Sequence, residues 1–143
     1  MALRIVHWAC RIILAGIFLY SGYIKIESPL QFAATLSNYQ LFPPSLILPL
    51  STYFPWMEIV LGASMLIGWR LPWFAAATAG LLSVFIVLLA VTYFRGIEAD
   101  CGCFGPGDRI SPLTIARDAS FLLPALFLAA EARIRGRLKQ VSP

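Results

Sequence analysis

The chain has 143 residues, of which 59% are hydrophobic and only 13% are charged, and its mean hydropathy is +0.80. Soluble domains are roughly half apolar and about a quarter charged, so this composition excludes an ordinary soluble domain, and its hydrophobicity excludes a disordered chain. The net charge of +4 does not indicate nucleic-acid binding, because the basic residues form no single stripe and membrane proteins use them for orientation. We therefore expect one integral membrane domain over residues 1–143, embedded in a lipid bilayer.

Four stretches are long and apolar enough to span a bilayer, which takes roughly 20 residues. They cover about residues 5–24, 46–69, 72–94 and 112–130. Lys and Arg are more frequent on the side that holds both termini, and the positive-inside rule places that side in the cytoplasm. The sequence therefore predicts an all-α bundle of four transmembrane helices in a bacterial inner membrane. Its loops at 25–45 and 95–111 are expected in the periplasm.

The first outer loop contains a predicted short helix, which Ser28-Pro29 begins and Pro43-Pro44 ends. Phe32, Leu36 and Tyr39 follow one another at i, i+4 and i+7, so they share one face of that helix. The apolar face is expected to lie on the membrane surface or over the mouth of the bundle.

Two features of the spans bear on helix shape and packing. Pro49 and Pro55 are expected to bend or break the second span. The small residues between positions 75 and 80 favour close helix packing within or between chains, so the sequence is compatible with a homo-oligomer.

Cys101 and Cys103 lie one residue apart in the second outer loop, beside the turn residues Gly102 and Gly105. Thiols in the oxidising periplasm tend to pair, and Gly102 permits the tight bend because it lacks a Cβ. A bridge across one residue closes so short a loop that it constrains the unfolded chain weakly. Strained or exposed bridges tend instead to be labile or catalytic. We therefore interpret the two cysteines as an exchangeable dithiol–disulfide pair and as the catalytic residues.

Two other interpretations of the pair stay open at this stage. The bridge can be a static staple that only shapes the loop. Two thiolates also suit a soft ion such as Cu(I), but tetrahedral zinc needs two more ligands, and the single histidine, His7, is predicted on the far side of the membrane. We therefore expect no metal. Cys10 lies near the cytoplasmic end of the first span and is interpreted as an inert small hydrophobe.

A second set of polar residues lies within the first two spans or at their ends. Charged side chains inside a span usually face the bundle interior or a cavity. The rise per residue of an α-helix gives Arg11 and Glu58 depths in the membrane that an arginine side chain can bridge, so the two are expected to approach each other. Lys25 lies at the outer end of the first span and is expected to extend toward the headgroups. Such a site either fixes helix packing as an ion pair or forms a polar cavity that holds a quinone headgroup or relays protons. The candidate residues for this intramembrane site are Arg11, Glu58, Lys25, Tyr20, Ser21 and Trp56.

Taken in order, these residues resemble the DoxX-like membrane proteins, and in particular the branch of the methylamine-utilisation protein MauE. The resemblance covers the chain from about residue 11 to about residue 125, and its most specific piece is Cys101-Gly102-Cys103-Phe104-Gly105. The other matching positions are Arg11, Gly16, Ser21-Gly22, Lys25, Pro29, Phe32-Ala33, Leu36, Tyr39, Pro43, Pro55-Trp56, Glu58, Gly62 and Gly68.

The resemblance implies a four-helix membrane protein concerned with periplasmic disulfide chemistry, with Cys101 and Cys103 as its redox pair. The implied task is to help a disulfide-rich periplasmic protein mature alongside a thioredoxin-like partner. In one mechanism, a partner thiolate attacks the disulfide and a membrane quinone reoxidises the pair. In the other, electrons from the cytoplasm keep the partner reduced. We expect the first, because the second needs thiols that are reachable from both faces of the membrane.

A positive charge near the pair would favour either mechanism by lowering a thiol pKa, and Arg95 or Arg109 is the expected source. The alternative outside redox chemistry is a non-catalytic membrane anchor or assembly subunit. It would bind a periplasmic partner through the two outer loops, and its disulfide would be structural.

Overall fold

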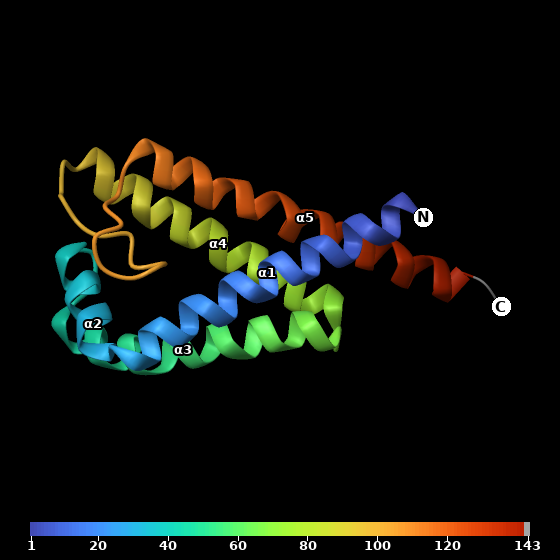
Figure 1. Cartoon of the computed structure of the whole chain (residues 1–143), viewed down its shortest axis with the longest axis horizontal. Coiled ribbons are helices and arrows are strands. Elements are labelled where there is room, and N and C mark those ends of the chain that lie inside the picture. The colour runs from blue at the N-terminus through green and yellow to red at the C-terminus, as the bar shows by residue number, and fades with distance from the viewer. Residues whose placement is uncertain (142–143) are drawn as a thin grey trace.

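The computed structural model describes the backbone of residues 1–141 and the side chains of residues 1–138. Over that range the chain forms α1 (Ala2–Glu27), α2 (Pro29–Asn38), α3 (Pro44–Ile67), α4 (Leu71–Phe94) and α5 (Pro112–Val141), as Figure 1 shows. All of these except α2 are long and apolar enough to span a membrane. The predicted four-span helical bundle is therefore confirmed, with α2 as the short helix that follows the first span.

The helix ends follow from local chemistry. At the start of α5, the Ser111 hydroxyl oxygen accepts a hydrogen bond from the backbone N–H of Thr114 at 3.1 Å. Pro112 occupies the first helical position, where no backbone hydrogen bond is lost. At the other end of the bundle, α3 stops at Gly68, whose φ of +78° is a left-handed conformation that glycine adopts at low cost.

Pro49 and Pro55 do not break the second span, because α3 continues through both of them. Each proline removes one backbone donor, but transmembrane helices tolerate this loss where neighbouring hydroxyls and helices satisfy the backbone. The carbonyls that lose their N–H partner are those of Ser45 and Ser51, four residues before each proline. Ser51 and Thr52 each donate a hydroxyl hydrogen bond to the Leu48 carbonyl at 2.9 Å in the same stretch. The helix continues past both prolines, and Glu58 is buried in the bundle.

The four long helices are arranged as two pairs, with α1 packed mainly on α3 and α4 mainly on α5. Figure 1 shows the N-terminus and the C-terminal end of α5 at one end of the bundle. The loop between α4 and α5 lies at the other end, together with α2. The two outer loops, residues 28–43 and 95–111, therefore meet at one end of the bundle. This follows because successive spans run in opposite directions.

The core lies between the long helices, around Leu14, Phe18, Met65, Ala79 and Leu128. The outward faces of the same helices carry large apolar side chains that are mostly exposed, such as those of Trp73 and Leu123. In water these faces would form apolar patches far larger than those of soluble monomers. They are suited to lipid contact.

Close contact between α1 and α3 depends on glycine, and this gives a first testable prediction. A Cβ on Gly22 would lie 2.9 Å from the Pro55 carbonyl oxygen, whereas nothing lies within 4 Å of the corresponding position at Gly16. Gly22→Ala must push the helices apart and is expected to cost about 1–3 kcal/mol. Gly16→Ala, in the same helix, is expected to be neutral or slightly stabilising. Thermal unfolding in detergent measures both, and equal melting temperatures for the two variants would contradict this packing.

Candidate functional site

The two loop cysteines are held in a small hairpin-like turn. Asp100 and Arg109 form an isolated antiparallel bridge. Beside it, the Cys101 N–H donates to the Asp108 carbonyl at 2.7 Å, and the Ile110 N–H donates to the Ala99 carbonyl at 3.0 Å. These bonds define the loop while both cysteines are free thiols. A disulfide is therefore not needed to close this loop.

The two glycines of the loop have left-handed backbone conformations, with φ values of +74° at Gly102 and +101° at Gly105. Residues with a Cβ adopt such values only at a steric cost. Gly102 is also pressed against α2, because an added Cβ would lie 3.0 Å from Cγ2 of Thr35. The loop therefore turns tightly and returns both sulfur atoms toward the bundle.

Helix α2 covers this loop with its apolar face. Phe32, Leu36 and Tyr39 are all buried, which favours the expectation that this face lies over the mouth of the bundle. The Tyr39 hydroxyl donates to the Cys101 carbonyl oxygen at 2.5 Å. Burial, together with nearby Cys101 and Cys103, raises the pKa of the Tyr39 hydroxyl, so it remains a donor at neutral pH. Tyr39 thus holds the backbone of Cys101 in place from the side of α2.

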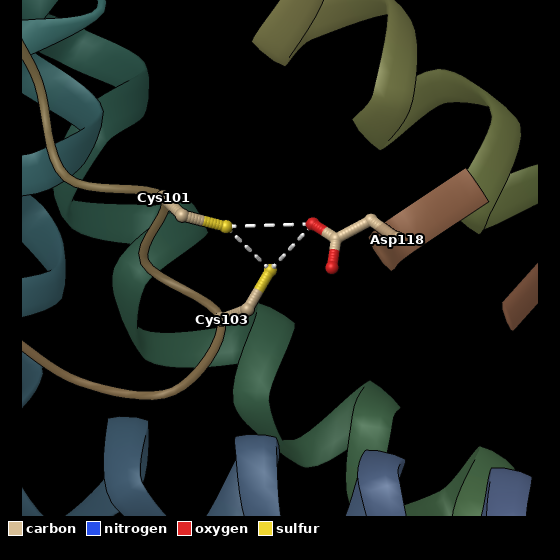
Figure 2. A group of neighbouring side chains, drawn as sticks. All are labelled: Cys101, Cys103 and Asp118. Carbon is tan, nitrogen blue, oxygen red and sulfur yellow. Dashed lines mark hydrogen bonds between the residues drawn. The ribbon is translucent and has the colours of Figure 1, made fainter. Parts of the chain in front are cut away.

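The two sulfur atoms meet a carboxylate from α5 (Figure 2). The Sγ atoms of Cys101 and Cys103 lie 3.0 Å apart, and each lies 3.5 Å from Oδ2 of Asp118. Cys101 is fully buried, and the Asp118 side chain is almost fully buried. Sequence reasoning missed Asp118 as a site residue. The available signal was its position beside Arg117 in the first turns of an otherwise apolar helix.

A positive charge lies beside the Cys101 thiol, but it belongs to Arg117, which was not one of the two expected residues. One Nη of Arg117 lies 3.8 Å from Sγ of Cys101 and 2.9 Å from Oδ2 of Asp108, while its Nε donates to Oδ1 of Asp118 at 3.1 Å. Arg95 instead contacts the Gln40 carbonyl. Arg117 belongs to the first turns of α5, and the folded loop brings Cys101 back to that helix. Distance along the sequence does not show this contact.

The Cys103 thiol does not have the lowered pKa that would favour its reaction. Burial raises the pKa of this thiol well above its usual value, and contact with the Cys101 thiol and the negative charge of Asp118 raise it further. Lys25 opposes the shift without cancelling it. At neutral pH the Cys103 thiol is therefore protonated, and it must lose its proton before it can act as a nucleophile.

The intramembrane charges pair differently from the prediction. Glu58 accepts hydrogen bonds from Lys25 Nζ at 2.7 and 2.8 Å, and the Ser21 hydroxyl donates to Glu58 at 3.2 Å. Lys25 also donates to Ser21 Oγ at 2.8 Å, so all three of its N–H donors are used. Lys25 does not extend to the headgroups, because its side chain is only 3% exposed.

The predicted approach of Arg11 to Glu58 does not occur. The Arg11 guanidinium donates to the carbonyl oxygens of Met65 and Leu66, each at 2.8 Å. These acceptors belong to the last turn of α3, whose carbonyls have no partner within the helix. Arg11 therefore caps α3 at the end of the bundle that holds the termini, far along the helix from Glu58.

Two further candidates of the intramembrane set lie on the outside of the bundle. Tyr20 and Trp56 are 55% and 58% exposed, so their side chains face the lipid. The Tyr20 ring still reaches the loop and stacks on Phe104 at 6.2 Å between ring centroids. Of the predicted intramembrane set, the structure brings together Ser21, Lys25 and Glu58.

One cavity joins this polar cluster to the cysteine loop. Lys25 of α1 and Glu58 of α3 line it, together with Cys103 of the loop and Asp118 of α5. Its remaining walls are largely apolar and include the rings of Phe54, Phe85, Phe104 and Phe121. The cavity volume is about 40 Å³, which is enough for water but small for a larger guest.

Asp118 adds a third ligand atom to the two sulfurs, which bears on the question of a metal. Among the side chains that the structure describes, Cys101, Cys103 and Asp118 place their ligand atoms within 4.8 Å of one another. Sulfur ligands of a tetrahedral zinc ion, at about 2.3 Å from the metal, are separated by about 3.75 Å. The observed separation of 3.0 Å is shorter, so this arrangement fits formation of an S–S bond better than it fits zinc.

Comparison with known proteins identifies the family. A family model described as methylamine utilisation protein MauE matches residues 3–131. The chain belongs to the MauE family. The match confirms the resemblance to MauE proteins that the sequence indicates, and it includes both cysteines, Asp118 and the Lys25–Glu58 pair. No solved structure gives a significant match to the chain.

Two curated MauE proteins show how far the similarity extends. The chain is 34% identical over 131 residues to the methylamine utilization protein MauE of Paracoccus versutus. It is 31% identical over 127 residues to the protein of the same name from Paracoccus denitrificans. These alignments cover 90% and 87% of this chain, and 69% and 67% of the two relatives.

Proposed function

We propose that the chain is a membrane thiol-disulfide redox protein that acts in methylamine utilisation. It exchanges disulfides with a periplasmic thioredoxin-like or client protein through Cys101 and Cys103, and a membrane quinone accepts the electrons. The observation that carries this proposal is the 3.0 Å separation of the two sulfur atoms beside a buried carboxylate and an arginine. The sulfurs need to move only about 1 Å closer to reach the bond length of a disulfide.

The loop hydrogen bonds support exchange over a static staple. The bridge at Asp100 and Arg109, the backbone bonds beside it and the Tyr39 contact already hold the loop. A disulfide across one residue would add little constraint. The pair is therefore free to open and close without loss of the loop structure.

The roles of the two cysteines follow from their exposure. Cys103 is partly exposed, whereas Cys101 is buried, so an incoming thiolate reaches Sγ of Cys103. Cys101 then leaves as a thiolate, which the guanidinium of Arg117 at 3.8 Å stabilises. A second thiolate of the partner displaces Cys103. The partner dithiol becomes a disulfide, and the pair gains two electrons and two protons.

The cavity supports a link to quinone, because Cys103 lies on the same aromatic-lined space as the Lys25–Glu58 cluster. A quinone ring is larger than the cavity volume of about 40 Å³, so its entry requires one of the lining phenylalanine rings to rotate. The quinone would take two electrons and two protons from the dithiol and leave as hydroquinone, while the Cys101–Cys103 disulfide forms again.

Replacement of both cysteines tests the proposal against a non-catalytic anchor. In a Paracoccus denitrificans strain without its own MauE, we expect the wild-type chain to restore growth on methylamine and Cys101→Ser/Cys103→Ser to abolish that growth. Serine keeps the size and the loop geometry but cannot form a disulfide. Cys10→Ser is the matched control and is expected to behave as wild type. Growth of the double variant at the wild-type rate, with equal protein in the membrane, would show an anchor with a dispensable disulfide.

A further inference from the structure

We infer that Asp118 takes and returns the proton of the Cys103 thiol during each redox cycle, and is therefore a catalytic residue of the reaction. This inference rests on the proposed function and adds a third residue to its site. It is based on the different contacts that the two carboxylate oxygens make.

The two oxygens of Asp118 have separate partners. Oδ1 accepts the Nε–H of Arg117 at 3.1 Å, which fixes the orientation of the carboxylate. Oδ2 faces the loop and lies 3.5 Å from both sulfur atoms, as Figure 2 shows. One oxygen is thus anchored, and the other is placed where a thiol proton can be transferred.

The chemistry at Cys103 requires such a group. Because burial raises its pKa, this thiol remains protonated at neutral pH. Cys101 is fully buried and Asp118 is only 2% exposed, so the side of Cys103 that faces them is shielded from bulk water. An internal carboxylate therefore provides a shorter route for the proton than hydroxide from solution.

The proton and electron balance is simple for oxidation of the pair. Asp118 takes the proton from Cys103 as its sulfur attacks the oxidant and forms a bond to it. The Cys101 sulfur then attacks Cys103, the bond between Cys103 and the oxidant breaks, and the reduced oxidant leaves. The Cys101–Cys103 bond forms, two electrons pass to the oxidant, and two protons leave the thiols. During reduction, Asp118 returns the proton to Cys103 when this sulfur is released as a thiolate.

Other polar and charged groups surround Asp118, and their contacts limit the routes by which the thiol proton can leave it. From α1 and α3, Lys25 and Glu58 face the same cavity, and they are bonded to each other. From α2, the Tyr39 hydroxyl is committed to the Cys101 carbonyl. On the loop side, Asp108 shares Arg117 with Asp118 but has no bond to a sulfur atom. The cavity of about 40 Å³ between these groups is large enough for water, which can carry the proton away from Asp118.

Asp118→Asn and Asp108→Asn form a matched pair for the test. Both carboxylates bind Arg117, but only Asp118 contacts the sulfur atoms. The purified, reduced chain in detergent is oxidised with glutathione disulfide, and formation of the Cys101–Cys103 bond is followed by mass-tagged maleimide. We expect Asp118→Asn to slow bond formation at neutral pH by about 100-fold or more. We expect Asp108→Asn, which weakens the hold on Arg117 but removes no group from the sulfur atoms, to slow bond formation far less.

The pH dependence keeps the inference testable if Asp118→Asn fails to fold. With an internal proton acceptor, the wild-type rate changes by much less than about tenfold per pH unit around neutrality, because the thiol proton does not leave the site. Simple ionisation of a thiol with a raised pKa would give about tenfold per unit. That steep slope in wild type would overturn the inference, and it is the slope expected for Asp118→Asn.

Three further results would also overturn it. If Asp118 acted only through its negative charge, it would disfavour the thiolate. Asp118→Asn would then leave the rate unchanged or increase it. Stoichiometric zinc in the wild-type chain that is lost from Asp118→Asn would make Asp118 a metal ligand. An Asp118→Glu variant as slow as Asp118→Asn would exclude a proton-transfer role. Because glutathione disulfide replaces both the quinone and the partner, failure of the proposed function would leave these rates unaffected.

Discussion

Removal of one charge of the Lys25–Glu58 pair is expected to destabilise the chain by about 3–5 kcal/mol, because the remaining charge stays buried without its partner. The expectation follows from the burial of both side chains and from the complete use of the Lys25 donors. Lys25→Met leaves the carboxylate of Glu58 with only the Ser21 hydroxyl. Thermal unfolding in detergent, followed by circular dichroism, measures the loss.

The double variant separates pairing from packing. Lys25→Met/Glu58→Leu removes both charges and fills the space with apolar groups, so it is expected to recover most of the lost stability. Glu27→Gln, an exposed site in the same helix, is the control and is expected to change stability by less than about 0.5 kcal/mol. If Lys25→Met proved as stable as wild type, the buried ion pair would not hold α1 to α3.

The two cysteines are expected to differ strongly in their capture of a partner. Cys101→Ser leaves the partly exposed Cys103 thiol but removes the resolving thiol, so a mixed disulfide with the partner accumulates. Cys103→Ser leaves only the buried Cys101. We expect at least about tenfold more mixed disulfide from Cys101→Ser, because access governs the rate of thiol–disulfide exchange. Non-reducing electrophoresis of acid-quenched membranes, followed by mass spectrometry, measures the adducts.

The double variant, Cys101→Ser/Cys103→Ser, controls for adducts at Cys10 and is expected to form none. Equal capture by the two single variants would contradict the assignment of Cys103 as the attacked sulfur. Greater capture by Cys103→Ser would reverse the roles of the two residues, and Arg117 would then lie beside the nucleophile.

The fold was largely predictable because its elements rest on local signals. Apolar length defines the four spans, and the Ser111-Pro112 pair defines the start of α5. The helical spacing of Phe32, Leu36 and Tyr39 identifies the buried face of α2. Each of these features is determined within a few turns of one helix. None requires knowledge of how the helices are placed relative to one another.

The pairing of the charges was not predictable in the same way. The helical rise predicted that Arg11 would reach Glu58, but α1 extends beyond the end of α3. The guanidinium therefore lies next to Gly68, at the end of that helix. Glu58, further along α3, is left for Lys25. The relative displacement of two helices decides such pairings, and composition does not encode it.

The contact between the cysteines and Asp118 depends on tertiary structure. The loop turns inward at Gly102, beneath α2, and reaches α5 within its first turns. The cysteine spacing alone indicated redox chemistry, but it could not show which carboxylate or which arginine would lie beside the sulfurs. Arg95 and Arg109 are nearer to the cysteines in sequence, but the guanidinium that contacts Cys101 is that of Arg117.

The redox state of Cys101 and Cys103 in native membranes tests the central claim most directly. Cells are acid-quenched and alkylated with a mass-tagged maleimide, before and after a pulse of membrane-impermeant reductant, with quinone synthesis intact or blocked. The account predicts that the pair starts oxidised, is readily reduced, and becomes oxidised again only when quinone is present. A bridge that resists the reductant, or that recovers equally well without quinone, would contradict it.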